Sequence, residues 1–75
     1  MAEYARVIVD ISQEKLDKTF DYRIPERLKD EVIIGIQVYI PFGSRHITGY
    51  VVELTDAVDY DVEKIKDIAD IVRES

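Results

Sequence analysis

Two strand-like runs flank a turn in residues 34–54, whose sequence is IGIQVYIPFGSRHITGYVVEL. In the first run, Ile34 to Ile40, apolar residues alternate with Gln37 and Tyr39, and this period of two is typical of a half-buried strand. The apolar residues that share one face are Ile34, Ile36, Val38 and Ile40. The run therefore predicts a strand that packs against an apolar core.

The turn that follows, residues 41–46, has the residue types of a chain reversal. Gly43 readily takes a positive φ, and Pro41 lacks the N–H that a central strand would use, so the first strand is expected to close at Pro41. A second strand is expected from Ile47 to Leu54. Because Gly49 in its middle weakens strand propensity, it predicts a bulge, a sharp bend or the close approach of another backbone.

Alternation also predicts two strands earlier in the chain, from Ala5 to Ile11 and from Thr19 to Ile24. The stretch between them, residues 12–18, is polar apart from one leucine and is expected to be a loop or a single turn. Pro25 ends the second of these strands. The proline-first segment 25–28 predicts a short helical turn.

The last third of the chain is less clear. Residues 55–61 predict an acidic loop, and residues 62–72 fit two structures, an amphipathic helix and a two-sided strand. The apolar residues at helical spacing are Val62, Ile65, Ile68, Ala69 and Val72. The pattern alone favours the helix.

The composition favours strands over helices. Isoleucine and valine together number 20, whereas the chain has three leucines and four alanines, and branched side chains suit pleated strands. Four to five short strands with one short helical turn predict a mainly β fold at the border with α+β, a small OB-like β-barrel. With 75 residues, the chain is expected to form one domain over residues 1–75.

Charge and residue types argue against several classes of function. The formal charge is −6, and residues 51–75 carry three Lys/Arg against eight Asp/Glu, which disfavours a broad phosphate-binding surface. With no cysteine and one histidine, the chain offers no thiol nucleophile and no thiolate or imidazole-rich metal centre, so a stand-alone enzyme is not expected. The longest apolar run, residues 32–36, is too short for a bilayer, and we expect a cytoplasmic protein.

Three strings stand out from the rest of the chain: DKTFDYRIP at residues 17–25, GIQVYIPFGSR at 35–45 and TGYVV at 48–52. In this order they resemble the opening domain of the primosomal protein N′ (PriA) family, the bacterial replication-restart helicases. The resemblance runs from about Tyr4 to Val72. The family's last segment is similar to a strand, so the resemblance favours a strand over residues 66–72.

The resemblance implies a domain that binds the 3′ end of a single DNA strand, such as the end of the nascent leading strand at a stalled fork. It also implies that the chain is the N-terminal fragment of a larger helicase, to which ATP and zinc would belong. No cofactor is expected in these 75 residues themselves. The implied partners are forked DNA with a single-stranded 3′ end, the helicase domains of the same chain, the primosome and single-strand-binding proteins, and no membrane.

Carried over motif by motif, the family's end-binding pocket corresponds to Phe20, Asp21, Gly43 and Lys66. An ionised Asp21 would accept hydrogen bonds from the 3′-hydroxyl or from base N–H groups, and would repel a 3′-phosphate. Gly43 would let the backbone approach the sugar, and Lys66 would contact a phosphate. Alternation sets Phe20 and Tyr22 opposite Asp21, so the pocket would meet Phe20 through its backbone while both rings fill the core.

Residue types alone leave a plainer role open at each position. Asp21 also suits a solvated strand residue and Phe20 a core ring. Gly43 also suits a turn glycine and Lys66 a surface lysine. A second class of function is open too, a protein-interaction module whose acidic surface, residues 53–61, docks a basic partner. An apolar or uniformly acidic patch over Asp21 and Gly43 would favour that class.

Overall fold

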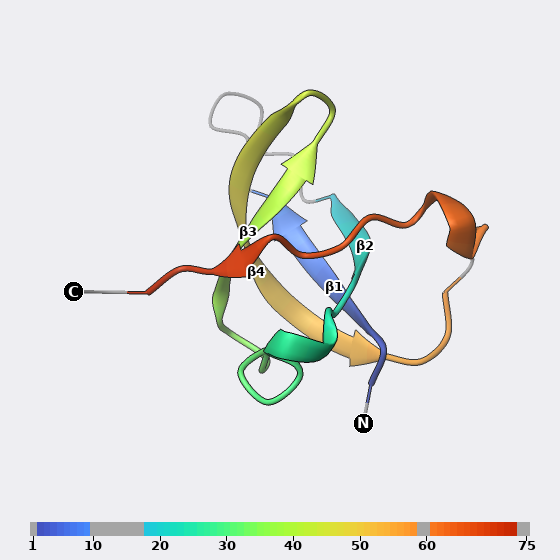
Figure 1. Ribbon diagram of the computed structural model, residues 1–75, viewed down its shortest axis with the longest axis horizontal. Helices are drawn as coiled ribbons and strands as arrows, with labels where there is room; N and C mark the ends of the chain where they lie inside the picture. The colour runs from blue at the N-terminus through green and yellow to red at the C-terminus, as the bar shows by residue number, and fades with distance from the viewer. Residues whose placement is uncertain (1, 10–17, 59–60, 74–75) are drawn as a thin grey trace.

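An antiparallel sheet of five strands is the framework of the computed structural model, which describes residues 2–9, 18–58 and 61–73 (Figure 1). The strands are β1 (Tyr4–Val9), β2 (Thr19–Arg23), β3 (Gln37–Phe42), β4 (Arg45–Thr55) and β5 (Asp70–Ile71), in the order β2-β1-β4-β3-β5. Two single turns of 3-10 helix are η1 (Glu26–Leu28) and η2 (Val62–Lys64). The predicted mainly β fold is confirmed, and so is the helical turn after Pro25.

Strand β4 is the longest strand and pairs with β1 on one side and β3 on the other. Its register against β1 shifts by one residue, because Arg6 faces Glu53 whereas Val7 faces Val51. Val52 is therefore the extra residue of a bulge. Because a bulge bends its strand and increases the local twist, it helps the sheet to curl around its apolar face.

Gly49 lies three residues before this bulge, where β1 crosses closest to β4. A Cβ at Gly49 would stand 2.6 Å from Cγ1 of Val7 and 2.7 Å from the carbonyl oxygen of Ile8. Both distances are far below van der Waals contact. Of the three alternatives that the sequence left open, the close approach of another backbone is thus the reason for this glycine.

Strand β3 continues through Pro41 to Phe42, so the prediction that Pro41 closes the strand is wrong. Alternate residues of a strand turn their backbone groups to opposite sides, and the carbonyls of Gln37 and Tyr39 face the C-terminal stretch. Pro41 follows the same alternation. Its missing N–H therefore lies on the β5 side of β3. Because β5 pairs only with Val38 and Tyr39, no hydrogen bond between strands is lost at Pro41.

The ends of the other predicted strands differ from the observed ones by a few residues. Strand β3 begins at Gln37 rather than Ile34, because residues 34–35 form a turn in which Gly35 has a φ of 94°. The predicted end of the first strand at Ile11 lies outside the described residues, as does most of the loop over residues 12–18.

The stretch after η2 pairs as a strand, so the helix that its apolar spacing favours is wrong and the strand implied by the family resemblance is confirmed. Arg23 of β2 donates its N–H to the Lys66 carbonyl at 2.9 Å and accepts from the N–H of Ile68 at 2.9 Å. The N–H groups of Ala69 and Val72 then donate to β3 at 2.8 and 2.9 Å. The stretch thus changes partner from one strand to another.

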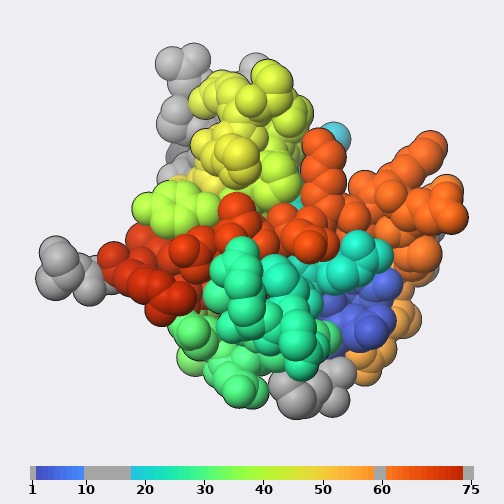
Figure 2. Space-filling model, viewed as in Figure 1, coloured from blue at the N-terminus to red at the C-terminus, as the bar shows by residue number. Residues whose placement is uncertain are grey.

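This stretch joins the two ends of the sheet without completing a ladder. Its contact with β2 is a single parallel bridge, Arg23 to Asp67, and its contact with β3 is the two-residue strand β5. The predicted barrel is therefore only an approximate description of an open, curled sheet. Figure 2 shows residues 61–73 lying across the face of the molecule, between η1 and the β3–β4 turn.

The core lies inside the curl and includes side chains from β1, β3, β4, η1 and the C-terminal stretch. Its fully buried large residues are Leu28, Ile40, Ile68, Val7, Val38 and Val51. Ile68 contributes to this core from the C-terminal stretch, which fixes the residues before it next to β2. In the parts of the chain that the structure describes, no helix has the length and apolar character to cross a membrane.

Candidate nucleic-acid pocket

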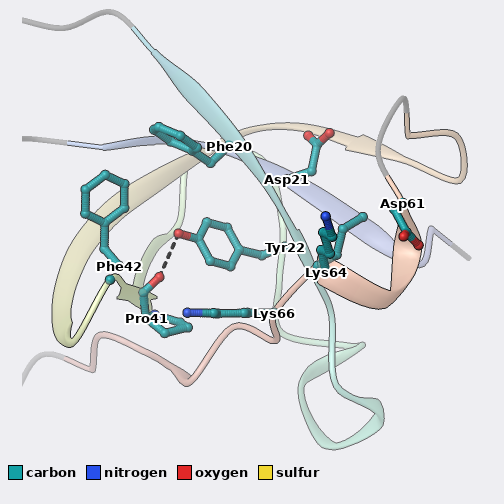
Figure 3. A pocket seen from close by; sticks show the side chains of 10 residues that line it. Phe20, Asp21, Tyr22, Pro41, Phe42, Asp61, Lys64 and Lys66 are labelled. Carbon is teal, nitrogen blue, oxygen red and sulfur yellow. Dashed lines mark hydrogen bonds between the residues drawn. The ribbon is translucent and has the colours of Figure 1, made fainter.

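A pocket of about 540 Å³ lies where the edge strand β2, the β3–β4 turn and η2 meet (Figure 3). Its lining residues are Phe20, Asp21, Tyr22, Pro41, Phe42, Gly43, Asp61, Lys64, Ile65 and Lys66. All four residues predicted from the sequence, Phe20, Asp21, Gly43 and Lys66, are among them. The fold therefore brings together residues from three separate stretches of the chain.

Aromatic rings form one wall of the pocket. The Phe20 and Phe42 ring centroids are 5.2 Å apart, with an interplanar angle of 78°, an edge-to-face contact. Tyr22 is buried beside them and donates its hydroxyl to the Pro41 carbonyl at 2.8 Å, as the dashed line in Figure 3 marks. Burial raises the pKa of the Tyr22 phenol, so its hydroxyl stays protonated and this link between β2 and β3 persists at neutral pH.

The Asp21 carboxylate is held by an arginine of the neighbouring strand. Arg6 Nε lies 3.0 Å from Asp21 Oδ1, and Arg6 also contacts Glu53 at 3.2 Å. Arg6 and Asp21 face each other in the register of β1 and β2, as a pair whose backbone groups are not hydrogen-bonded to each other. Side chains approach closely at such a pair. The Asp21 side chain is only 5% exposed, so it is not a solvated strand residue.

The backbone of Asp21, in contrast, faces the pocket side of β2. Arg23 bonds outward to the C-terminal stretch through both its N–H and its carbonyl, and Asp21, two residues earlier, presents its own groups to the same side. Phe20 and Tyr22 turn their backbone groups to β1 instead. The arrangement is thus the reverse of the expected one. Asp21 presents its backbone N–H and carbonyl at the edge of β2, whereas Phe20 presents its ring to the pocket.

Gly43 begins the tight turn between β3 and β4. Its φ of 61° lies in the left-handed region that favours glycine. A Cβ added here would meet nothing within 4 Å, so the space beside it is open. The turn therefore needs glycine for its backbone conformation, and the missing side chain leaves the space beside the turn open.

Two lysines supply the positive charge of the pocket, Lys66 and Lys64. Both are exposed, and neither forms an ion pair with any residue in the described ranges. Asp61 is also at the rim, where its carboxylate accepts the backbone N–H of Glu63 at 3.1 Å and so begins η2. Within residues 2–9, 18–58 and 61–73, no cluster of His, Asp and Glu could hold a metal ion.

Six lining residues were not predicted from the sequence: Tyr22, Pro41, Phe42, Asp61, Lys64 and Ile65. A signal existed for two of them. Phe42 directly precedes Gly43 in the Pro-Phe-Gly string. Lys64 lies two residues before Lys66, so a strand interpretation of this stretch would have placed both lysines on one face, whereas the helical interpretation separated them.

A small β-domain in which half-buried aromatic rings line a pocket next to two exposed lysines has the features of a module that binds single-stranded nucleic acid. A sequence model of the PriA family, described as a 3′ DNA-binding domain (3′BD), matches residues 6–75. The chain is also 39% identical over 69 residues to the replication restart protein PriA of Bacillus subtilis (strain 168). The chain therefore belongs to the PriA 3′ DNA-binding domain family, and the resemblance carried by its three strings is confirmed.

The aligned residues cover 92% of this chain and 9% of the Bacillus subtilis protein. The chain thus spans about a tenth of the length of the curated relative that it matches. A DNA-binding domain of a replication-restart protein is the function that this membership supports.

Proposed function

We propose that this chain binds the 3′ end of a single DNA strand in the pocket between β2, the β3–β4 turn and η2. One observation carries the proposal. The four residues that the family resemblance implies for end binding come from three stretches of the chain, and they all line this one pocket. The pocket combines rings for a base, an open glycine turn for a sugar and cations for phosphate.

The aromatic wall suits the terminal base. Bases stack on aromatic side chains with little dependence on sequence, and Phe20 and Phe42 present such a surface beside the open turn at Gly43. Lys66, on the opposite side of the pocket, then contacts the phosphate that precedes the terminal nucleotide. A site of this kind needs few phosphate contacts, which is compatible with a formal charge of −6.

Asp21 is proposed to recognise the terminal nucleotide by hydrogen bonding. Its outward backbone N–H and carbonyl offer a donor and an acceptor, and the carbonyl suits a free 3′-hydroxyl, because the carboxylate is engaged with Arg6. Like charges about 4 Å apart repel by ~4 kcal/mol at an effective dielectric constant near 20. Because Arg6 compensates the charge of Asp21, we expect the preference for a 3′-hydroxyl over a 3′-phosphate to be about tenfold or less.

In the cell, the end would be that of the nascent leading strand at a stalled fork. The chain would act as one domain, N-terminal in a larger cytoplasmic helicase that uses ATP and zinc elsewhere and starts primosome assembly. The match covers 9% of the Bacillus subtilis relative, which supports a place within a longer protein. The helicase domains of the same protein, the primosome and single-strand-binding proteins would be its protein partners.

The alternative, a docking module for a basic protein, was expected to show an apolar or uniformly acidic patch over Asp21 and Gly43. The pocket is largely apolar, as such a module would have it, but it is not uniformly acidic, because two lysines lie beside Asp21 and Asp61. Of the acidic residues that follow β4, Asp56 lies outside the pocket lining and Asp61 is part of it.

The test is a fluorescence anisotropy titration with three labelled strands of one sequence, one with a free 3′-hydroxyl, one with a 3′-phosphate and one circular strand without ends. We expect the 3′-hydroxyl strand to bind best and the circular strand worst. Asp21→Asn keeps the backbone groups and removes the negative charge, so it should reduce the preference for the 3′-hydroxyl over the 3′-phosphate. Asp30→Asn, an exposed residue outside the pocket lining, is the matched control. Equal affinity of the wild-type chain for all three strands would refute the proposal.

A further inference from the structure

Lys64 is the last residue of η2, and Lys66 follows it after one extended residue, Ile65. Ile65 between them has a φ of −78° and a ψ of 126°, and its side chain is buried. Neighbours of a residue in extended backbone project to the opposite side, so both lysines point away from the core. A rise of ~3.3 Å per residue sets their backbones roughly 7 Å apart.

The two lysines extend to different parts of the pocket. Figure 3 shows the Lys66 side chain directed toward Pro41 and that of Lys64 directed toward β2. Each ammonium group is carried on a flexible four-carbon stem, which suits contact with a mobile phosphate. The pair therefore spans the pocket instead of converging on one point.

Two acids close to the lysines in sequence are engaged with other groups. Asp61 accepts the N–H of Glu63, and Asp67 pairs with Arg23 at 3.5 Å. Four arginines of the described chain are in ion pairs with carboxylates, namely Arg6, Arg23, Arg27 and Arg73. The two pocket lysines thus keep their charge available in a chain that is acidic overall.

We infer that Lys64 is a second phosphate-binding residue of the pocket, so that the strand end is held through its last two phosphates. Lys66 contacts the linkage between the last two nucleotides, and Lys64 contacts the linkage before it. This inference rests on the proposed function. It adds a residue that neither the sequence pattern nor the resemblance singled out, and it sets the length of strand that the pocket holds.

The salt dependence of binding tests the number of phosphate contacts. Each phosphate neutralised on a single strand contributes ~0.7 to the slope of log affinity against log salt. Between about 50 and about 200 mM KCl, two contacts lower affinity about sevenfold and one contact about threefold. We expect the first value for the wild-type chain and the second for Lys64→Gln, measured by anisotropy on a 5′-labelled strand with a free 3′ end.

Lys29→Gln is the matched control, because it removes the same charge at a residue outside the pocket lining. It should keep the sevenfold dependence. A wild-type slope in Lys64→Gln overturns the role of Lys64. A wild-type chain that does not prefer a free 3′ end to a circular strand overturns the proposed function instead, so the two failures are distinguishable.

A strand with one uncharged methylphosphonate linkage identifies the phosphate that Lys64 contacts. Neutralising the second linkage from the 3′ end should weaken binding of the wild-type chain but have little further effect on Lys64→Gln, since the contact is already gone. In the same way, neutralising the first linkage from the 3′ end should weaken binding of the wild-type chain but have little further effect on Lys66→Gln. If the loss of affinity caused by Lys64→Gln and the loss caused by neutralising the second linkage simply add, the inference is overturned.

Discussion

At the scale of single residues, pairing across strands decides what Asp21 can contribute to the pocket. Residue type and alternation predicted an exposed carboxylate, whereas the register of β1 and β2 sets Arg6 directly opposite, and the Asp21 side chain is only 5% exposed. Register depends on which strands become neighbours, and one sequence does not show this. The resemblance could therefore locate Asp21 in the site, but only the fold shows that its backbone faces the pocket.

Tyr22 leads to a prediction about pH. Burial raises the pKa of its phenol in the folded chain, so stability that is present below pH ~10 is lost as the pH rises through this raised value. Tyr22→Phe removes the hydrogen bond to the Pro41 carbonyl, which lowers the free energy of unfolding by about 1 kcal/mol at neutral pH. The difference from the wild-type chain should shrink in alkaline solution, where the wild type loses this contribution.

Urea denaturation at a series of pH values from neutral to alkaline measures this difference. Tyr50→Phe, which removes an exposed hydroxyl outside the pocket lining, controls for the loss of one tyrosine. A gap between wild type and Tyr22→Phe that stays constant with pH would show that the Tyr22 phenol ionises as readily in the folded chain as in the unfolded one.

At the scale of secondary-structure elements, patterns of period two located β2 and β4 well, because alternate residues of these strands face the core, with Tyr22 buried in β2 and Gly49 and Val51 buried in β4. The end of β3 was misplaced because Pro41 was expected to close the strand, whereas it pairs with β4 and its missing N–H lies on the other side, beyond the two residues of β5. The apolar pattern also favoured a helix after Val62. The buried residues of this stretch are three apart because it passes from β2 to β3. This tertiary arrangement produces the same apolar spacing as an amphipathic helix.

Gly49 gives a prediction at this scale, because its position is set by the crossing of β1 and β4. Gly49→Ala would press a Cβ against the backbone of Ile8, which cannot move without disturbing the ladder. We expect the free energy of unfolding to fall by about 2–3 kcal/mol, as for other overpacked core sites.

Gly43→Ala is the matched comparison for this substitution. Its Cβ would meet nothing within 4 Å, and only the positive φ is unfavourable, at about 1 kcal/mol. Thermal and urea denaturation of both variants measure the two losses. A smaller loss for Gly49→Ala than for Gly43→Ala would contradict the packing described for β1 and β4.

At the scale of the whole molecule, the curled sheet and the C-terminal stretch together make the pocket. The sheet alone supplies the aromatic wall and the glycine turn, and the stretch that joins its two ends supplies both lysines. Composition predicted the fold class and the resemblance predicted four lining residues. The remaining lining residues depended on how the last stretch crosses the molecule, which neither of these could predict.

The overall charge of the molecule is likewise a poor guide to its site. The formal charge of −6 and the acids after residue 50 argued against phosphate binding. The fold pairs several of these acids with arginines and leaves Lys64 and Lys66 at the pocket. A site for one strand end therefore fits an acidic domain, whereas a surface for a whole strand would not.

The end of a DNA strand is proposed to enter this pocket, and an NMR titration of the isotope-labelled chain tests this most directly. On addition of a short single strand with a free 3′ end, the largest amide shift changes should fall at Phe20, Asp21, Gly43 and Lys66, and a circular strand should leave these amides nearly unchanged. Shift changes centred on the acidic residues after β4, or equal changes with the circular strand, would contradict it.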